Sequence, residues 1–117
     1  MTAIRLGPAD AIREGAMQGY ELADRHVLVA HIAGAYYCID ATCPHQGGDL
    51  SAGRLNGTIV TCPRHGSQFD VRDGALVKWV GMRPDQLRDA PETLKKMRPA
   101  VAYPVRAQDG DLFVDMA

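Results

Sequence analysis

Short apolar runs alternate with clusters of turn-forming residues along the chain. Residues 26–32 (HVLVAHI) and 35–39 (AYYCI) are rich in β-branched, aromatic and aliphatic side chains, and Ala33-Gly34 separates them. Each run has the length of a β-strand, and two strands joined by a short glycine-containing turn form a β-hairpin. The pattern therefore predicts a hairpin over residues 26–39.

Further short runs continue this pattern, at residues 17–22, 58–61, 67–70, 102–106 and 111–115. Asp73-Gly74 follows the third of these runs, and Gln108-Asp109-Gly110 separates the last two, which predicts a second hairpin. Strands at roughly ten-residue spacing, with turn residues between them, are typical of antiparallel sandwiches and barrels. We therefore expect an all-β protein.

Residues 84–97 do not follow the strand pattern. They contain several helix-tolerant residues, and Asp89 can cap a short helix that has Pro91 in its first turn. We expect one short helix inserted between strands here, and a short helical turn after Pro8. The sequence has no internal repeat and no linker, so we expect a single domain over residues 1–117.

Composition and charge limit the function classes. The chain of 117 residues has 46 % hydrophobic residues, which supports one compact core. Its 13 basic and 14 acidic side chains give a net charge of −1, which argues against a nucleic-acid or membrane-surface partner. No apolar run approaches the roughly 18 residues of a membrane span. An odd count of 3 cysteines, without a signal-peptide pattern, predicts a cytoplasmic protein rather than a secreted disulfide scaffold.

Two short blocks, CPH at residues 43–45 and CPRH at residues 62–65, carry the candidate chemistry. Each block pairs one thiol with one imidazole: Cys43 with His45, and Cys62 with His65. Thiolate and imidazole ligands together suit zinc or iron–sulfur chemistry. A zinc site usually takes a pair of cysteines from one loop. Here each loop gives one cysteine and one histidine, which favours a cluster of two chemically different irons. A Cys₂His₂ zinc-stabilised structural or regulatory domain is the alternative.

The whole pattern, Cys-x-His-x₁₆-Cys-x₂-His with HGS at 65–67 and FD at 69–70, resembles the Rieske family. The resemblance implies one Rieske-type [2Fe–2S] cluster as cofactor. It implies that Cys43 and Cys62 bind one iron, and that His45 and His65 bind the other. It also implies a small antiparallel β-sandwich with a cluster-binding subdomain.

Two departures separate the chain from the Rieske proteins of respiratory complexes that it resembles. Those proteins carry an extra cysteine in each loop, joined as a disulfide, where this chain has Gly48 and Arg64. They also donate hydrogen bonds to the cluster from a serine and a tyrosine, where this chain has Ser67 and Phe69. One fewer donor predicts a reduction potential at the low end of the Rieske range of about −150 to +300 mV.

These features resemble the ferredoxins that carry electrons from a flavin-dependent reductase to a terminal oxygenase. The resemblance implies an electron carrier rather than an enzyme, with redox proteins as partners and no small-molecule substrate of its own. The small subunit of an assimilatory nitrite reductase is an alternative within the same family. Arg64, between two of the ligands, is either simply solvated or a positive contact to an acidic partner.

The other residues with chemical potential have simpler explanations. Cys38 lies in an apolar strand, and we expect it to be a buried small hydrophobe. His26 and His31 have no cysteine or carboxylate at ligand spacing, so we expect ordinary strand-end residues. Asp70 and Asp73 fall at a turn, where aspartate is favoured for local hydrogen bonds.

Overall fold

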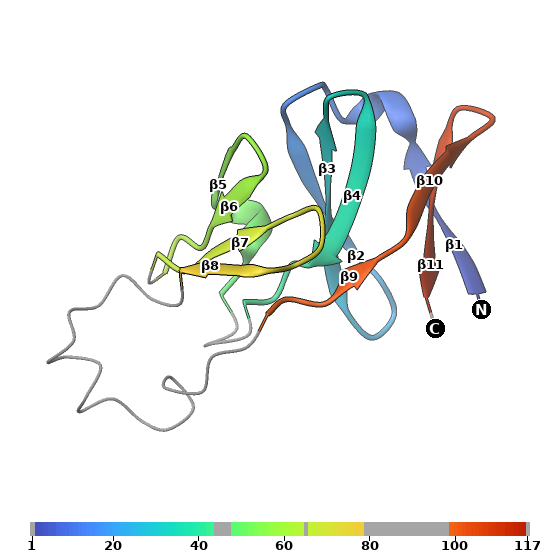
Figure 1. Cartoon of the computed structure of the whole chain (residues 1–117). Coiled ribbons are helices and arrows are strands. Elements are labelled where there is room, and N and C mark those ends of the chain that lie inside the picture. Colours follow the sequence, from blue (N-terminus) through green and yellow to red (C-terminus); the bar gives the residue numbers. More distant parts are fainter. Residues whose placement is uncertain (1, 44–47, 65, 79–98, 117) are drawn as a thin grey trace, which may run out of the picture.

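The computed structural model describes residues 2–43, 48–64, 66–78 and 99–116. These residues form three antiparallel sheets, which Figure 1 shows as neighbouring layers. The first sheet has the order β1 (Thr2–Pro8), β11 (Asp111–Met116) and β10 (Val105–Gln108). The middle sheet has the order β2 (Met17–Glu21), β3 (His26–Ile32), β4 (Ala35–Asp40) and β9 (Ala102–Tyr103). The third sheet has the order β5 (Arg54–Asn56), β6 (Ile59–Thr61), β7 (Gln68–Asp70) and β8 (Leu76–Lys78).

Strand β3 lies in the central layer, and both of its faces are therefore buried. Successive side chains of a strand point to opposite faces. Val27 and Val29 pack toward the first sheet, whereas Leu28 and Ala30 pack toward the third sheet, and all four are fully buried. The same alternation in β4 sends Cys38 toward the first sheet. Two hydrophobic cores therefore share one central sheet, which confirms the predicted all-β antiparallel fold.

The two predicted hairpins are confirmed, and their turns have the backbone that tight hairpins require. Ala33 and Gly34 have φ values of 53° and 79°, and Asp109 and Gly110 have φ values of 53° and 84°. Two consecutive positive φ values match the right-handed twist of the flanking strands. The carboxylate of Glu14 accepts hydrogen bonds from the N–H groups of Gly34 (2.8 Å) and Ala33 (2.6 Å). These bonds hold the pKa of Glu14 below its ordinary value and fix the turn.

Some elements differ from the sequence expectations. The predicted helical turn after Pro8 is the 3-10 helix η1 (Ala9–Ala11), but the strand β1 before it was not predicted. The three-residue strands β5 and β8 were not predicted either, because each is too short to show an alternation of apolar and polar residues. A second 3-10 helix, η2 (Leu50–Ala52), follows the first cysteine loop. The helix predicted over residues 84–97 lies outside the described residues. Within the described part of the chain, no helix has the length and hydropathy that a membrane crossing requires.

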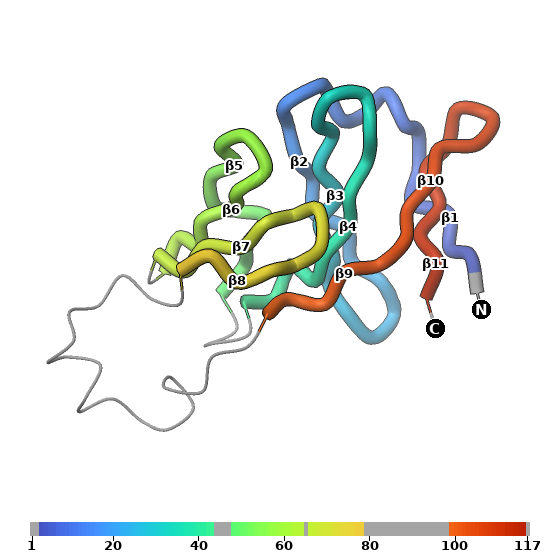
Figure 2. The backbone as a smooth tube through the Cα atoms, in the orientation of Figure 1, coloured from blue at the N-terminus to red at the C-terminus, as the bar shows by residue number. Residues whose placement is uncertain are grey.

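Figure 2 traces how the backbone brings the candidate site together. The chain leaves β4 toward the first cysteine block, forms the third sheet with the second block, and returns through β9 beside β4. The third sheet packs its inner face, with Val60 and Phe69, against Leu28 and Ile39 of the middle sheet. This packing fixes both cysteine loops on one shared core.

Candidate metal centre

Cys43 lies in a loop that follows β4 and is closed at its base. Its backbone N–H donates to the carbonyl of Gly48 (2.7 Å), and a β-bridge joins Thr42 to Asp49. The side chain of Cys43 is 1 % exposed. The loop thus starts and ends at a short antiparallel ladder, which directs the thiol into the core.

Cys62 lies in a second loop, between β6 and β7, that is closed in the same way. Its N–H donates to the carbonyl of Ser67 (2.8 Å), and its own carbonyl accepts from the N–H of Gly66 (3.1 Å). Gly66 has a φ of 76°, a conformation that favours glycine. The side chain of Cys62 is also 1 % exposed. Both thiols belong to the same buried cluster of side chains.

The two loops contact each other at Gly48. A Cβ atom placed on Gly48 would lie 2.9 Å from Cys62 Sγ and 3.0 Å from Arg64 Cδ. A side chain at this position would therefore push against the sulfur of the opposite loop. The structure places two cysteines that are 19 positions apart in sequence in one buried cluster, and only glycine fits at position 48 without a shift.

The other two predicted ligands, His45 and His65, lie outside the described residues. In the sequence, His45 follows Cys43 by two positions and His65 follows Cys62 by three positions. In the described ranges, no three His, Cys, Asp or Glu side chains gather closely enough to hold a metal ion. The structure thus places the cysteine half of the predicted site.

The described residues fit an iron–sulfur cluster by their chemistry. Cysteine thiolates are soft ligands that suit iron–sulfur chemistry, and Cys43 and Cys62 lie in one buried cluster, so they can serve one iron. Ser67, directly beyond the second loop, is fully buried and has an interaction partner. Phe69 is fully buried in β7 and has no hydroxyl to donate. Of these two described residues beside the second loop, Ser67 can therefore donate a hydroxyl hydrogen bond and Phe69 cannot.

Cys38 is separate from this centre. It is 2 % exposed and belongs to the core between the middle and first sheets, not to the core that holds Cys43 and Cys62. Burial, and secondarily the charge of Asp40, raises the pKa of its thiol to about 12. The prediction that Cys38 is a buried residue of the core is confirmed.

The two described histidines are structural. His26 Nδ1 lies 3.4 Å from Glu21, and its Nε2 lies 4.0 Å from Asp49. Sequence spacing did not reveal these carboxylates, because the sheet brings them to His26 from other segments. His31 Nδ1 lies 2.9 Å from a backbone carbonyl oxygen, and its ring stacks on Tyr36 with centroids 4.3 Å apart. Both histidines lie near the ends of β3, as predicted.

Asp70 and Asp73 make the local turn contacts that the sequence predicts. Both carboxylate oxygens of Asp70 accept from the Arg72 guanidinium, at distances down to 2.7 Å, and one also accepts from the Arg72 N–H. The bonds from Arg72 hold the pKa of Asp70 below its ordinary value. Asp73 accepts from the N–H of Ala75 (2.9 Å).

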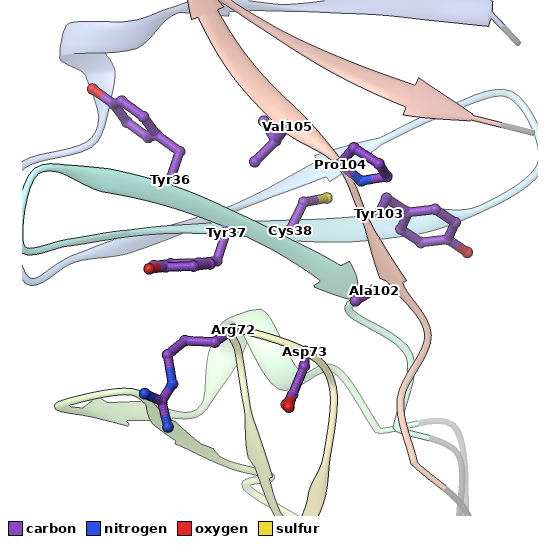
Figure 3. A pocket seen from close by; sticks show the side chains of 9 residues that line it. All are labelled: Tyr36, Tyr37, Cys38, Arg72, Asp73, Ala102, Tyr103, Pro104 and Val105. Carbon is purple, nitrogen blue, oxygen red and sulfur yellow. The ribbon is translucent and has the colours of Figure 1, made fainter.

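A cavity of about 430 Å³ lies between the middle sheet and the turn after β7 (Figure 3). Its lining residues are Tyr36, Tyr37, Cys38, Arg72, Asp73, Ala102, Tyr103, Pro104 and Val105. Because the turn is at the opposite end of β7 from the Cys62 loop, this cavity is not part of the cysteine site.

Comparison with known proteins decides between zinc and an iron–sulfur cluster. The sequence matches the Rieske [2Fe-2S] domain family over residues 2–98. The chain belongs to this family. A Rieske domain carries one [2Fe–2S] cluster, so the cofactor predicted from the ligand pattern is confirmed and the zinc alternative is not favoured.

Relatives of this Rieske chain include proteins of different size. It is 35 % identical over 72 residues to "Cholesterol 7-desaturase nvd" of Xenopus laevis, covering 61 % of this chain and 15 % of that protein. It is 32 % identical over 65 residues to the "Naphthalene 1,2-dioxygenase/salicylate 5-hydroxylase systems, ferredoxin component" of Ralstonia sp, covering 56 % and 62 %. The chain thus spans less than two thirds of both relatives.

A solved structure matches the Rieske chain over nearly its full length. The ferredoxin of Sphingomonas yanoikuyae B1 superposes with a TM-score of 0.78 at 25 % identity, covering 99 % of this chain and all 100 % of the ferredoxin. The three-sheet architecture is therefore that of a Rieske ferredoxin.

Proposed function

We propose that this protein carries one electron at a time from a flavin-dependent reductase to a terminal oxygenase. The observation that carries the proposal is the contact between the Cys43 loop and the Cys62 loop at Gly48, with both cysteines buried, in a chain of the Rieske family. The dioxygenase-system relative and the ferredoxin of matching length support the role of a carrier. Neither relative favours the nitrite reductase alternative.

We propose the ligand set predicted from the sequence. Cys43 and Cys62 bind one iron, and His45 and His65 bind the other. The burial of both thiols, each 1 % exposed, agrees with the first pair as the inner ligands. Each histidine follows its cysteine within three positions, so each loop supplies one ligand to each iron.

The protein contributes a packed support at the base of both loops for electron transfer. The bound cluster accepts and releases one electron. Both loops are closed by backbone hydrogen bonds, from Cys43 to Gly48 and from Cys62 to Ser67, and both stand on a packed sheet. Buried thiols that are held from a packed core favour a small structural rearrangement when the charge changes. The chain thus acts as a carrier and not as an enzyme with its own substrate.

Three further expectations remain proposals. Residues 1–117 form one domain, which agrees with the shared central sheet of the two cores. The protein works in the cytoplasm, which agrees with its three free cysteines. Its partners are redox proteins, without nucleic acid or membrane.

Reconstitution tests this function. The purified protein is combined with NADH, a flavin-dependent reductase, a terminal oxygenase and the substrate of that oxygenase, and product formation is measured. We expect turnover to depend on the chain and to disappear in Cys62→Ser, while the matched control Cys38→Ser retains it. Full turnover without the chain, or equal turnover with Cys62→Ser, contradicts the proposal.

A further inference from the structure

One row of side chains crosses the outer face of the third sheet beside the Cys62 loop. The strand register places Arg54 opposite Thr61, Thr61 opposite Gln68, and Gln68 opposite Lys78. Paired residues of antiparallel strands point to the same face. Gln68 Nε2 donates to Thr61 Oγ1 (3.2 Å), which links the two middle members.

This row faces solvent and ends in a cation on each side. The neighbouring positions in the strands, Val60 and Phe69, face the core, so the row lies on the opposite face. Arg54 and Lys78 are exposed, and neither has an ion-pair partner among the described residues. The row also adjoins the loop that begins at Cys62, in which Arg64 is exposed.

The carboxylates of the same region do not cancel these charges. Asp70 is paired with Arg72 at the other end of β7. Asp49 accepts from Ser51 and lies 4.0 Å from His26 of the middle sheet. Among the described residues, a chain with a net charge of −1 therefore gathers unpaired cations on this face, next to the Cys62 loop.

The sheet also leaves an apolar side chain at the same edge. The register shifts between Gln68 and Phe69, so that Val77 is an extra residue in β8 beside Lys78. Val77 is 53 % exposed, one of two large hydrophobic residues that are exposed among those described. An apolar contact next to charged groups is typical of a protein interface, whose buried centre excludes water.

We propose that this face, formed by Arg54, Thr61, Gln68, Lys78 and Val77, docks a redox partner protein that presents a carboxylate-rich surface. The proposal rests on the electron-carrier function and adds the partner's chemistry. Opposite charges accelerate the encounter and orient it, and the apolar side chain stabilises the docked state. Docking here brings the partner against the loop that holds Cys62, which shortens the electron's path.

Two cobalt(III) oxidants of opposite charge test the field of this face. Tris(oxalato)cobaltate(III) is an anion and tris(phenanthroline)cobalt(III) is a cation, and each takes one electron from the reduced cluster and becomes cobalt(II). Oxidation rates are measured by stopped flow from about 0.01 to about 0.5 M salt, across which screening changes strongly. Added salt should lower the rate of oxidation by the anionic oxidant. The protein's net negative charge alone would predict the opposite, a rate that rises with salt.

Charge-reversal variants locate the effect. Arg54→Glu and Lys78→Glu should each slow oxidation by the anionic oxidant severalfold at low salt. At high salt, the rates of these variants and of the natural protein should converge. Arg13→Glu is the matched control, because it changes the net charge equally. Arg13 is exposed, and it lies near Gly15, whose N–H bonds to His31 at the end of β3 far from Cys43. Arg13→Glu should therefore leave the rate of oxidation by the anionic oxidant nearly unchanged.

Polyanions identify the kind of partner. Poly-L-glutamate, as a mimic of a carboxylate-rich protein surface, should slow oxidation of the natural protein by the anionic oxidant and have less effect on Lys78→Glu. Slowing by duplex DNA but not by poly-L-glutamate would overturn the choice of a protein partner. Equal salt dependence in all variants would overturn the docking face. The visible spectrum and one-electron reduction are recorded first for every protein, and only their absence from the natural protein would count against the electron-carrier function.

Discussion

Replacing Gly48 with alanine should weaken the retention of the cluster while leaving the fold intact. The added Cβ would lie 2.9 Å from Cys62 Sγ, about 0.5 Å closer than the 3.4 Å at which ordinary van der Waals contact begins. The neighbouring Arg64 Cδ, at 3.0 Å, belongs to a flexible side chain and can move at little cost. The sulfur can turn away in the metal-free protein but not when it binds iron, so the penalty falls on the cluster-bound state.

The magnitude follows from the cost of overpacking. A methyl group forced into a packed site costs about 1–3 kcal/mol. That free energy corresponds to about 5- to 150-fold weaker retention of the cluster. The assay mixes the purified protein with excess iron chelator and follows the loss of visible absorbance over time. Iron and labile sulfide per chain are measured before mixing.

Gly57→Ala is the control. Gly57 has a φ of 62°, and a Cβ atom at this position would have nothing within 4 Å, so alanine adds backbone strain without a clash. We expect a loss of about 1 kcal/mol in the free energy of unfolding and normal cluster retention. If Gly48→Ala loses its cluster no faster than Gly57→Ala, the inferred contact between the two loops is wrong.

Three further predictions follow from the described contacts. Cys38→Ser should leave the cluster spectrum unchanged, and because its pKa is about 12, native Cys38 should resist alkylation by iodoacetamide at neutral pH. Asp70→Asn should lower the free energy of unfolding by less than about 1 kcal/mol at neutral pH, because it removes a charged partner of Arg72, whose side chain is exposed to solvent. The pKa of Asp70 is lowered in the folded state. Its stabilisation is therefore present above the unfolded pKa of about 4 and is lost as pH falls further, so urea unfolding of the two proteins should converge in acid. Protein-film voltammetry should give a potential near the low end of about −150 to +300 mV, because Phe69 has no hydroxyl, and a value well above 0 mV would contradict this reasoning.

The sequence predicts the elements whose signals are local. The hairpin turns at Ala33-Gly34 and Asp109-Gly110 are visible because each contains a glycine, which tolerates a positive φ, and separates two apolar runs. Strand β1 has no such signal, since its partner β11 lies at the other end of the chain. The order of the layers could not be predicted from a local pattern either, because the sequence of β3 does not show which sheet covers each of its faces.

The candidate site likewise has features that the sequence predicts and features that depend on the fold. Its ligand types and spacing are sequence properties, so Cys43, His45, Cys62 and His65 could be selected without a structure. The packing of Gly48 against Cys62 could not, because it depends on how two separate loops meet. The cationic row beside the Cys62 loop likewise appears only once the strand register joins Arg54 to Lys78 through two intervening strands. Residues that act through long-range pairing need the fold before they can be recognised.

Mössbauer spectroscopy of the oxidised protein tests the central claim most directly. Two thiolate ligands on one iron and two imidazole ligands on the other predict two distinct iron environments of equal area. One environment for both irons, or a colourless protein that holds a single zinc after anaerobic preparation, would contradict the proposed ligand set.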